Sequence, residues 1–395
     1  MNGTPKMLVA ATSEQFVRGF LLPYGRHFRR LGWRVDAIAR GISGSPEAAE
    51  AFDRVWEARW TRSPGAPRNL TAALPRVRKL VAAEGYDLVH VHTPVASFVT
   101  RLALRGLRRR QGVKVVYTAH GFHFHEGGSR WRNLAFEGAE RLAAHWTDAL
   151  VVINRDDHAV ARTFGGIGEE RVTYMPGIGV DLSAFDPGRV SDAAVRAVRQ
   201  ELAIGHDDHL LLMVAAFDPG KRHRDALRAL AACGRDDVVL AFAGGGPLQE
   251  ETRELGRALG IADRLRFLGQ RDDIPALLRA SDALVLPSER EGLPRSVMEA
   301  LSMRRPVLGT RIRGVRDLVD DTTGVLVDVG DVHALAHGMR FLVEHPVKRA
   351  EMGRHGRRAM AAFELERVLG MHRELYGRVL GAGVGTAVGA VARRA

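Results

Sequence analysis

The sequence predicts an α/β protein made of two domains, each a doubly wound parallel sheet covered by helices. Short β-rich runs alternate with longer amphipathic runs, which is the pattern of parallel strands joined by helical crossovers. The alternation breaks once, over residues 175–189, and then resumes. The chain of 395 residues is also too long for one ordinary core, because domains of about 100 to 200 residues are usual. Two sheets of similar size are therefore expected.

Buried strands are expected where a short apolar run is closed off by polar residues or glycine, because such runs are typical of strands covered on both faces. In the first half these runs are residues 7–11, 35–39, 88–91, 113–118 and 149–153. Amphipathic runs over residues 15–31, 70–84 and 95–110 predict helices. Gly32 and Gly85 follow two of them, where C-terminal caps are expected.

The break in the alternation marks the predicted domain boundary. Its sequence, MPGIGVDLSAFDPGR, is rich in Gly, Pro and Asp and has no helical period. Strands are expected afterwards over residues 210–216, 238–243, 265–268, 283–286, 307–310 and 325–327. We predict domains over residues 1–177 and 190–370, then a C-terminal helix and frayed tail over residues 371–395. Two such sheets bind ligands in a cleft at the carboxyl ends of their strands.

Composition restricts the class of protein. The 58 basic and 46 acidic residues give a net charge of +12, which suggests an anionic partner: phosphates, nucleic acid or an anionic membrane surface. Cys233 is the only cysteine, which excludes an internal disulfide and fits a reducing compartment. The apolar runs are shorter than the roughly 18 residues of a spanning helix, and no signal peptide is visible near residues 7–11. A soluble or peripheral protein is expected.

A pair of glutamates dominates the second half. In PSEREGLPRSVMEA, residues 287–300, a strand end is followed by a tight turn and a helix, with Glu291 in the turn and Glu299 in the second helical turn. Pro294 suits the first helical position. Free N–H groups at the start of this helix would hold a phosphate, and the two carboxylates would accept hydrogen bonds from sugar hydroxyls. The stretch predicts a nucleotide-sugar site.

Two further loops follow predicted strands of the same domain. Gly244, Gly245 and Gly246 would let the backbone approach a ligand, or would form an ordinary strand-to-helix turn. Their spacing is not that of a Rossmann fingerprint, so no nicotinamide cofactor is supported. Lys221 and Arg222 form either a solvated basic turn or a diphosphate site. Lys221 could neutralise a departing diphosphate without a metal, and the chain has no Asp-x-Asp triplet to hold one.

Polar residues at other strand ends are less specific. His120, His123 and His125 follow the strand at residues 113–118; zinc is one reading, but no carboxylate or cysteine completes a known spacing. We expect His120 to face the cleft and bind a substrate hydroxyl. His90 and His92 are expected to alternate, so that at most one faces the cleft. The loop around Gln270 and Arg271 would contact a base edge through its backbone, or be a polar connection.

Basic residues gather in the first domain. The predicted helix 95–110 carries arginines among Phe98, Leu102 and Leu107, and Arg130 and Arg132 flank Trp131. Such a mixture lies on an anionic bilayer surface, or forms an ordinary solvated helix face.

Together these residues resemble the retaining glycosyltransferases of family 4, whose GT-B fold has two Rossmann-like domains facing across a cleft. The resemblance covers almost the whole chain and fails only in the terminal tail. Its most specific piece is EGLPRSVMEA, supported by Lys221, the loop at residues 244–247 and FLGQRDDI. YTAHGFHF, TDALVVINRDD and MPGIGVDLSAF are similar to the branch that builds capsular, exopolysaccharide and lipid-linked oligosaccharides.

The resemblance implies a role for each site residue. Glu299 would hold the ribose hydroxyls, Glu291 the hydroxyls of the donor sugar, and His120 would contact that sugar from the other domain. The diphosphate would bind to Lys221 and to the backbone of Gly292, Leu293, Pro294, Arg295 and Ser296, while Gly244, Gly245, Gly246 and Arg271 would line the nucleotide pocket. Transfer would retain the anomeric configuration, with a diphosphate oxygen accepting the acceptor's proton and no metal or cofactor needed.

The chain departs from the family at two points. Ala216 stands five positions before Lys221, where the family usually has an arginine or another polar residue, so Arg222 or Arg224 would have to supply that diphosphate contact. The loop after the first strand is ATSEQF rather than paired glycines, so donor contacts are not carried over to it.

The resulting hypothesis is a cytoplasmic transferase, peripheral on the inner face of the membrane, that moves a sugar from a UDP-sugar to a polyprenyl-diphosphate-linked glycan in cell-surface polysaccharide synthesis. One alternative is a transferase with a soluble small-molecule acceptor. Another is a basic nucleic-acid-binding protein, but an aromatic content of 6% and the lack of a recognised module oppose it, so no nucleic acid partner is expected.

Overall fold

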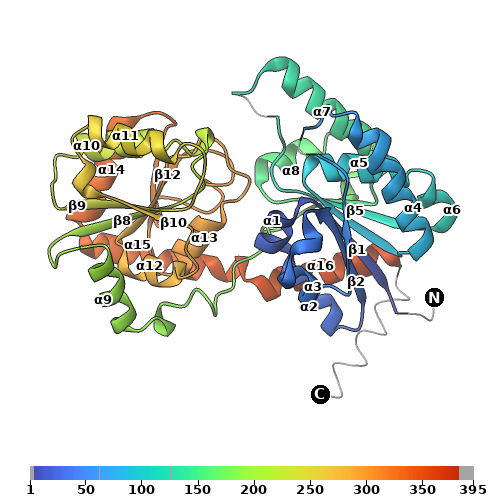
Figure 1. The fold of residues 1–395 in the computed structure, drawn as a ribbon, viewed down its shortest axis with the longest axis horizontal. Coiled ribbons are helices and arrows are strands. Elements are labelled where there is room, and N and C mark those ends of the chain that lie inside the picture. The colour runs from blue at the N-terminus through green and yellow to red at the C-terminus, as the bar shows by residue number, and fades with distance from the viewer. Residues whose placement is uncertain (1–3, 62, 125–126, 382–395) are drawn as a thin grey trace. The chain divides into compact units, whose positions relative to one another are not determined.

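The computed structural model describes residues 4–61, 63–124 and 127–381. The chain divides into two compact units, Met1–Ile178 with Arg367–Ala395, and Gly179–Glu366 (Figure 1). The last helix thus belongs to the first unit, which the boundaries drawn from the sequence did not anticipate.

The first unit contains a seven-stranded parallel sheet in the order β3-β2-β1-β4-β5-β6-β7. The strands are β1 (Lys6–Ser13), β2 (Arg34–Arg40), β3 (Arg54–Glu57), β4 (Leu88–His92), β5 (Lys114–Ala119), β6 (Ala149–Val152) and β7 (Val172–Tyr174). The order runs outward from β1 in both directions, which is double winding. The expected strands are all present; the edge strands β3 and β7 were missed.

Helical segments cover both faces of this sheet (Figure 1). They are α1 (Glu14–Phe16), the π-helical turn η1 (Val17–Leu21), α2 (Leu22–Arg30), η2 (Ile42–Gly44), α3 (Pro46–Ala51), η3 (Asn69–Ala73), α4 (Leu74–Glu84), α5 (Pro94–Leu104), α6 (Leu107–Gln111), α7 (Arg130–Ala144), α8 (Arg155–Ala161), η4 (Glu169–Arg171) and α16 (Leu365–Leu380). The predicted helix 95–110 is broken into α5 and α6 at Arg105 and Gly106. Gly85 caps α4 with a left-handed φ of 63°, as expected.

The second unit contains a six-stranded parallel sheet in the order β10-β9-β8-β11-β12-β13. The strands are β8 (His209–Val214), β9 (Val238–Ala243), β10 (Leu265–Gly269), β11 (Ala283–Leu286), β12 (Val307–Thr310) and β13 (Gly324–Val327). The helices are η5 (Pro187–Arg189), α9 (Asp192–Glu201), η6 (Pro219–Lys221), α10 (His223–Ala232), α11 (Gln249–Ala258), η7 (Ala262–Arg264), α12 (Ile274–Ala280), α13 (Arg295–Ser302), α14 (Val332–Glu344), α15 (Pro346–Ala359) and η8 (Met360–Phe363).

Strand β8 shows why the sequence pattern was informative. Leu210 and Leu212 pack into a hydrophobic cluster on one face of the sheet, while Leu211 and Met213 pack into another on the opposite face. Successive side chains point to opposite faces, so a strand covered by helices on both sides needs an uninterrupted apolar run. The predicted fold class, α/β with two Rossmann-like doubly wound parallel sheets, is confirmed.

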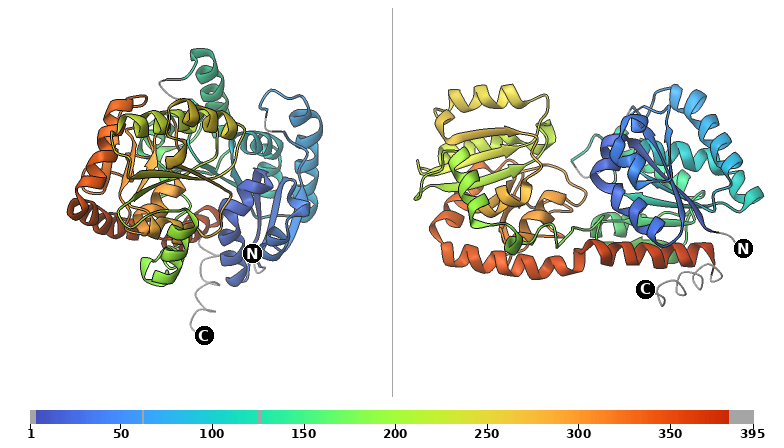
Figure 2. Two further views of the ribbon diagram at one scale, coloured as in Figure 1. Left: turned by 60° about the vertical axis from the view of Figure 1, so that its left-hand side comes forward. Right: turned by 60° about the horizontal axis from the view of Figure 1, so that its bottom comes forward.

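Helix α16 runs along the first unit (Figure 2, right, red), and its buried residues are Val368, Leu369, His372, Leu375 and Tyr376. His372 and Tyr376 are fully buried there, and the Tyr376 hydroxyl lies 2.5 Å from Nδ1 of His90. The predicted frayed tail beyond residue 381 lies outside the described residues. Among the described residues, no helix is long and apolar enough to cross a membrane.

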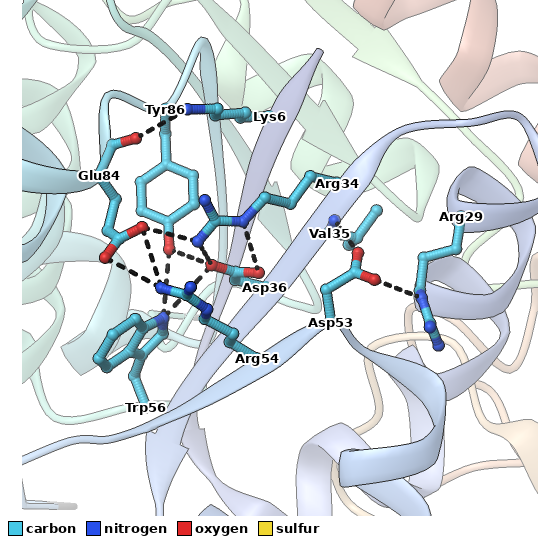
Figure 3. Close-up of polar contacts among 10 residues, drawn as sticks. All are labelled: Lys6, Arg29, Arg34, Val35, Asp36, Asp53, Arg54, Trp56, Glu84 and Tyr86. Atoms are coloured by element: carbon cyan, nitrogen blue, oxygen red, sulfur yellow. Dashed lines mark hydrogen bonds and ion pairs between the residues drawn. The ribbon is translucent and has the colours of Figure 1, made fainter. Parts of the chain in front are cut away.

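An ion-pair network holds the amino-terminal edge of the first sheet (Figure 3). Asp36 of β2 is completely buried and accepts hydrogen bonds from Arg34 at 2.7 Å and from the Tyr86 hydroxyl at 2.6 Å. Arg34 also binds Glu84 at 2.7 Å, and Glu84 pairs with Arg54 at 3.3 Å. The buried charge is therefore fully partnered, which is the condition for burying a carboxylate.

Candidate functional site

The carboxyl edge of the second sheet carries the predicted glutamates. Strand β11 ends at Leu286, and a turn leads into α13, whose first residue is Arg295. Pro294 is the N-cap, with φ −71° and ψ 119°, and so lies one position earlier than predicted. A Cβ on Gly314, whose φ is +77°, would lie 2.2 Å from the Gly292 carbonyl oxygen. Glycine at 314 therefore lets the loop after β12 support the turn that carries Glu291.

Lys221 and Glu291 form one ion pair. Lys221 Nζ donates to Glu291 Oε1 at 2.6 Å, and the Lys221 and Glu291 side chains are 27% and 10% exposed. Lys221 ends η6 after β8, and Glu291 follows β11; β8 and β11 are neighbours in the sheet, so residues 70 apart meet at one edge. Among the described residues, these are the only polar contacts of either charged group. Both charges keep unused hydrogen-bonding capacity.

Glu299 lies in the second turn of α13 and pairs with Arg295 in the first. Arg295 Nε donates to Glu299 Oε1 at 2.6 Å, and Glu299 is 6% exposed. Burial raises the pKa of the Glu299 carboxyl, and Arg295 partly opposes that shift. A hydroxyl that donated to the Glu299 carboxylate would form a charge-assisted hydrogen bond in surroundings of low polarity, where such bonds are strong.

The start of α13 is suited to an anion. Its first turn contains no acidic residue, and no side chain caps its N–H groups. Helix α11, which follows the glycine loop, instead has Glu250 and Glu251 in its first turn. Acidic residues in a first turn already offset the helix dipole, so α13 keeps the stronger positive end. The neighbouring Lys221 adds a full charge on the next loop.

The glycine loop is explained largely by contacts within the protein. A Cβ on Gly244 would lie 2.1 Å from the Ala215 carbonyl oxygen, and one on Gly246 would lie 2.7 Å from the Phe217 nitrogen. Their φ angles are +149° and +157°. These two glycines let the loop after β9 pack on the loop after β8. Of the three glycines, only Gly245 has room for a side chain, because a Cβ there would lie 4.0 Å from its nearest neighbours, two atoms of the Gln270 side chain.

The two arginines proposed for the nucleotide have carboxylate partners of their own. Arg271 binds Glu201 at 2.5 Å and Asp273 at 2.7 Å. Arg222 donates from Nε to Asp225 at 2.6 Å and lies 3.5 Å from Glu289. A nucleotide contact by either guanidinium would have to compete with these pairs, which the sequence did not indicate.

In the first unit, His120 is the third member of a row of histidines. Its Nε2 lies 2.9 Å from Nδ1 of His92, and its ring stands edge-on to Phe16 with centroids 5.0 Å apart. The rings of His90 and His92 are 4.0 Å apart on the same side of β4. The prediction that these two alternate was wrong, because residues two apart in a strand share one face. Burial lowers the pKa of His120 to about 3.

The hydrogen bonds select a tautomer for His120. His92 Nε2 is buried and has no partner among the described residues. If His120 Nε2 donated to His92 Nδ1, the proton of His92 would lie on its Nε2, and a buried N–H would have no acceptor. If His92 Nδ1 donates to His120 Nε2 instead, His92 Nε2 carries only an unpaired lone pair. Leaving a buried acceptor unpaired costs less than leaving a buried donor unpaired. His92 Nδ1 therefore donates, and His120 carries its proton on Nδ1. That N–H remains able to bind a hydroxyl oxygen.

Thr93, directly after His92, marks the same edge by its backbone. Its φ of 65° and ψ of 141° are strained for a β-branched residue. Thr93 Oγ1 accepts a hydrogen bond from the Thr12 nitrogen at 3.0 Å, which ties the ends of β4 and β1 together. Sequence reasoning missed Thr93, His372 and Tyr376; the i, i+4 pair on the last helix was the available signal for the latter two.

The other residues singled out in the first unit are His123, His125 and the predicted helix 95–110. The ring of His123 lies 5.4 Å from that of Phe136, and His125 lies outside the described residues. Among the described residues, no group of three His, Cys, Asp or Glu side chains could hold a metal ion. The lipid-facing interpretation of the helix 95–110 was wrong for Arg101 and Leu107, which are 1% and 7% exposed.

The chain is similar to known proteins over most of its length. The model for glycosyl transferases group 1 matches residues 195–359, and that for glycosyltransferase family 4 matches residues 22–184. The putative glycosyltransferase EpsD of Bacillus subtilis (strain 168) is 32% identical over 376 residues, covering 94% of this chain and 96% of EpsD.

Two other relatives differ in what they act on. The D-inositol 3-phosphate glycosyltransferase of Salinispora tropica is 30% identical, over 80% of this chain and 69% of its own length. The UDP-Gal:alpha-D-GlcNAc-diphosphoundecaprenol alpha-1,3-galactosyltransferase of Escherichia coli is 28% identical, over 66% of this chain and 67% of its own. The crystal structure of Anabaena HepE with UDP and glucose shares the fold, with a TM-score of 0.80, 20% identity and coverage of 95% of this chain and 100% of HepE.

Proposed function

We propose, since this chain belongs to the glycosyltransferases of group 1 and family 4, that it moves a sugar from a UDP-sugar to a polyprenyl-diphosphate-linked glycan in cell-surface polysaccharide synthesis. Transfer retains the anomeric configuration and needs neither a metal ion nor a cofactor. The observation that carries the proposal is the Lys221–Glu291 pair at 2.6 Å beside the uncapped start of α13. An ammonium and helix N–H groups suit a diphosphate, and a nearby carboxylate suits a sugar.

Donor binding exchanges the partners of this pair. The diphosphate takes the place of Glu291 on Lys221 and accepts hydrogen bonds from the backbone of residues 292–296. Glu291, released from Lys221, accepts hydrogen bonds from the hydroxyls of the donor sugar, and Glu299 accepts them from the ribose. The backbone at residues 244–246 and near Arg271 surrounds the nucleotide, with Arg222 as a further diphosphate contact. His120 donates from Nδ1 to a sugar hydroxyl.

The transfer step follows from these contacts. The bond from the anomeric carbon to the diphosphate oxygen breaks, and negative charge grows on that oxygen, where Lys221 stabilises it. The acceptor hydroxyl forms its bond to the anomeric carbon on the same face. Its proton passes to the departing diphosphate oxygen, so that the products are the glycoside and UDP. Atoms and charge balance without another base.

The names of two relatives support the proposed acceptor. The Escherichia coli relative is named for a diphosphoundecaprenol-linked acceptor, and EpsD shares nearly its whole length with this chain. Such an acceptor places the enzyme at the cytoplasmic face of the membrane as a peripheral protein. A second candidate is transfer to a small water-soluble acceptor, which the D-inositol 3-phosphate glycosyltransferase favours.

A thermal-shift panel of UDP-sugars tests the donor. A ligand at one hundred times its dissociation constant adds about 2.7 kcal/mol of stability, so the true donor should raise the unfolding temperature clearly. With Glu291→Gln, stabilisation by UDP should persist while the preference for one sugar is reduced. Stabilisation by no uridine nucleotide at all would contradict the proposal.

Turnover tests the acceptor and the metal. Donor consumption should need an extract of membrane lipids, and EDTA should leave the rate unchanged. Consumption with a water-soluble acceptor alone would favour the second candidate, and a rate restored only by a divalent cation would contradict metal independence. Proton NMR of the new linkage should show the donor's anomeric configuration.

A further inference from the structure

Helix α7 of the first unit exposes an unusual amount of apolar surface. Trp131 is 83% exposed, Leu134 61% and Leu142 51%. Ala135 and Gly138, between them, are also exposed. Residues at positions i, i+3, i+4, i+7 and i+11 fall on one side of a helix, at about 100° per residue. They form a continuous stripe along the outer side of α7, which we call the α7 stripe.

The inner side of the same helix is anchored by charge. Glu140 is buried and accepts hydrogen bonds from Arg101 at 2.7 Å and from the Tyr117 hydroxyl at 3.1 Å. The Arg101 guanidinium also lies 4.2 Å from the centre of the Tyr117 ring. The usual arrangement of an amphipathic helix is thus partly inverted, with an ionic pair inside and a tryptophan outside. Breaking a buried pair is costly, so the anchor prevents α7 from rotating its stripe toward the core.

The charges around the stripe are positive. Arg130 and Arg132 flank Trp131 and are exposed. Both acids of α7 are partnered within the protein, Glu140 by Arg101 and Glu137 by Arg141 at 2.8 Å. An anionic surface that approached the described residues of α7 would therefore meet Arg130 and Arg132, while both carboxylates of this helix are already paired. Each basic residue close to an anionic bilayer contributes about 1 kcal/mol.

We propose that the α7 stripe lies on an anionic phospholipid bilayer, with Trp131, Leu134 and Leu142 at the boundary of headgroups and acyl chains and with Arg130 and Arg132 on headgroup phosphates. This rests on the proposed function, because it gives that function its membrane-contacting surface. The surface retains Arg130, Trp131 and Arg132 of the basic patch expected from the sequence, but not the helix 95–110, where Arg101 serves as the anchor instead.

A second copy of the chain fits the stripe less well. Basic residues stand at both ends of α7, with Arg130 and Arg132 at the start and Arg141 and His145 at the end. In parallel, two such helices would bring Arg130 and Arg132 of both copies together, and like charges at close range repel; in the antiparallel arrangement these arginines would face Arg141, whose charge Glu137 already offsets, so neither orientation offers them an anion. Headgroup phosphates complement these charges. A bilayer is therefore the occupant that the charges favour.

Co-sedimentation of the full chain with vesicles tests the proposal. The wild type should bind vesicles of phosphatidylcholine mixed with phosphatidylglycerol, and bind phosphatidylcholine alone at least tenfold more weakly. Trp131→Ser combined with Leu134→Ser and Leu142→Ser should lower binding to the anionic vesicles at least tenfold. Val347→Ser is the matched control, because Val347 is 73% exposed on α15 of the second unit; this variant should bind as the wild type does.

Three outcomes would overturn the proposal. They are no binding of the wild type to anionic vesicles, full binding by the triple variant, and a dimer in light scattering that the triple variant dissolves. Stabilisation by UDP, measured on the same preparations, separates this proposal from the proposed function. A wild type that is stabilised by UDP but does not bind anionic vesicles would show that the surface alone is wrong, whereas a wild type that binds the vesicles without any stabilisation by UDP would show that the proposed function alone is wrong.

Discussion

The molecule uses ion pairs in two different ways. At the amino edge of the first sheet, Asp36 is buried and shared between Arg34 and Tyr86, and Arg34 is itself shared with Glu84 (Figure 3). At the carboxyl edge of the second sheet, Lys221 and Glu291 have only each other among the described residues. The first arrangement is saturated and can gain nothing from a ligand. The second can exchange its single contact for several, which is what a binding site requires.

Of the substitutions considered, the removal of the Glu299 carboxylate should have the largest effect. It should lower activity and leave the stability of the fold nearly unchanged. Glu299→Ala is expected to lower donor turnover about a thousandfold, the upper range for losing one preorganised polar group, because the ribose loses its acceptor. The urea midpoint should change little. Glu169→Ala is the matched control, since Glu169 pairs with Arg162 in the first unit and is 60% exposed. Wild-type turnover by Glu299→Ala would mean that this pair is structural.

Disrupting the saturated network should show the reverse pattern. Asp36→Asn removes a buried charge from Arg34 and Tyr86, so the free energy of unfolding should fall by about 3 kcal/mol. Stabilisation by UDP should be unaffected. Urea unfolding gives the first quantity and thermal shift the second, with Asp207→Asn, 99% exposed, as the neutral control. A loss of UDP stabilisation in Asp36→Asn would contradict the claim that the Asp36 network serves stability alone while the Lys221–Glu291 pair serves binding.

Acid should destabilise the carboxyl edge of the first sheet through its buried histidines. Burial lowers the pKa of His372 to about 4, against an ordinary value near 6.5. The unfolded chain therefore binds protons first, and stability that is present above pH 6.5 is lost as the pH falls toward 4, by about 1 to 2 kcal/mol for this group by pH 5.

His372→Phe should flatten this slope in urea unfolding between pH 6.5 and 5. His206→Phe should leave it unchanged, because His206 is 99% exposed. An unaltered slope in His372→Phe would show that His372 is not a source of the acid sensitivity.

The smallest effect is expected from His92, which positions His120 without touching the substrate. His92→Leu removes the donor to His120 Nε2, so ¹⁵N NMR should show His120 shifting from Nδ1–H toward Nε2–H. Donor kcat/KM should fall about tenfold, the value of roughly one hydrogen bond, with UDP stabilisation intact. His90→Leu is the control, since His90 contacts Thr118 and Tyr376 instead. An unchanged tautomer in His92→Leu would refute the positioning role.

The sequence was most informative where local pattern determines structure. Buried strands such as β9 and β11 were predicted to the residue, because parallel strands covered on both faces need unbroken apolar runs. The half-polar edge strand β3 offers no such run and was missed. The meeting of Lys221 with Glu291 could be anticipated from strand ends alone, since both follow strands whose carboxyl ends lie at one edge.

Long-range partners were beyond sequence reasoning. Arg101 was interpreted as a surface charge because nothing near it in the chain reveals Glu140, its partner 39 residues later. The return of His372 and Tyr376 to the first unit depends in the same way on tertiary packing. The glycines at 244 and 246 have a clear spacing, but only the structure shows that they make room for Ala215 and Phe217.

Calorimetric titration of UDP and of uridine, into the wild type and Lys221→Met, tests the central claim most directly. If the Lys221–Glu291 pair opens to receive the diphosphate, Lys221→Met should bind UDP at least tenfold more weakly and bind uridine with unchanged affinity. Equal affinity of both proteins for UDP would contradict the account.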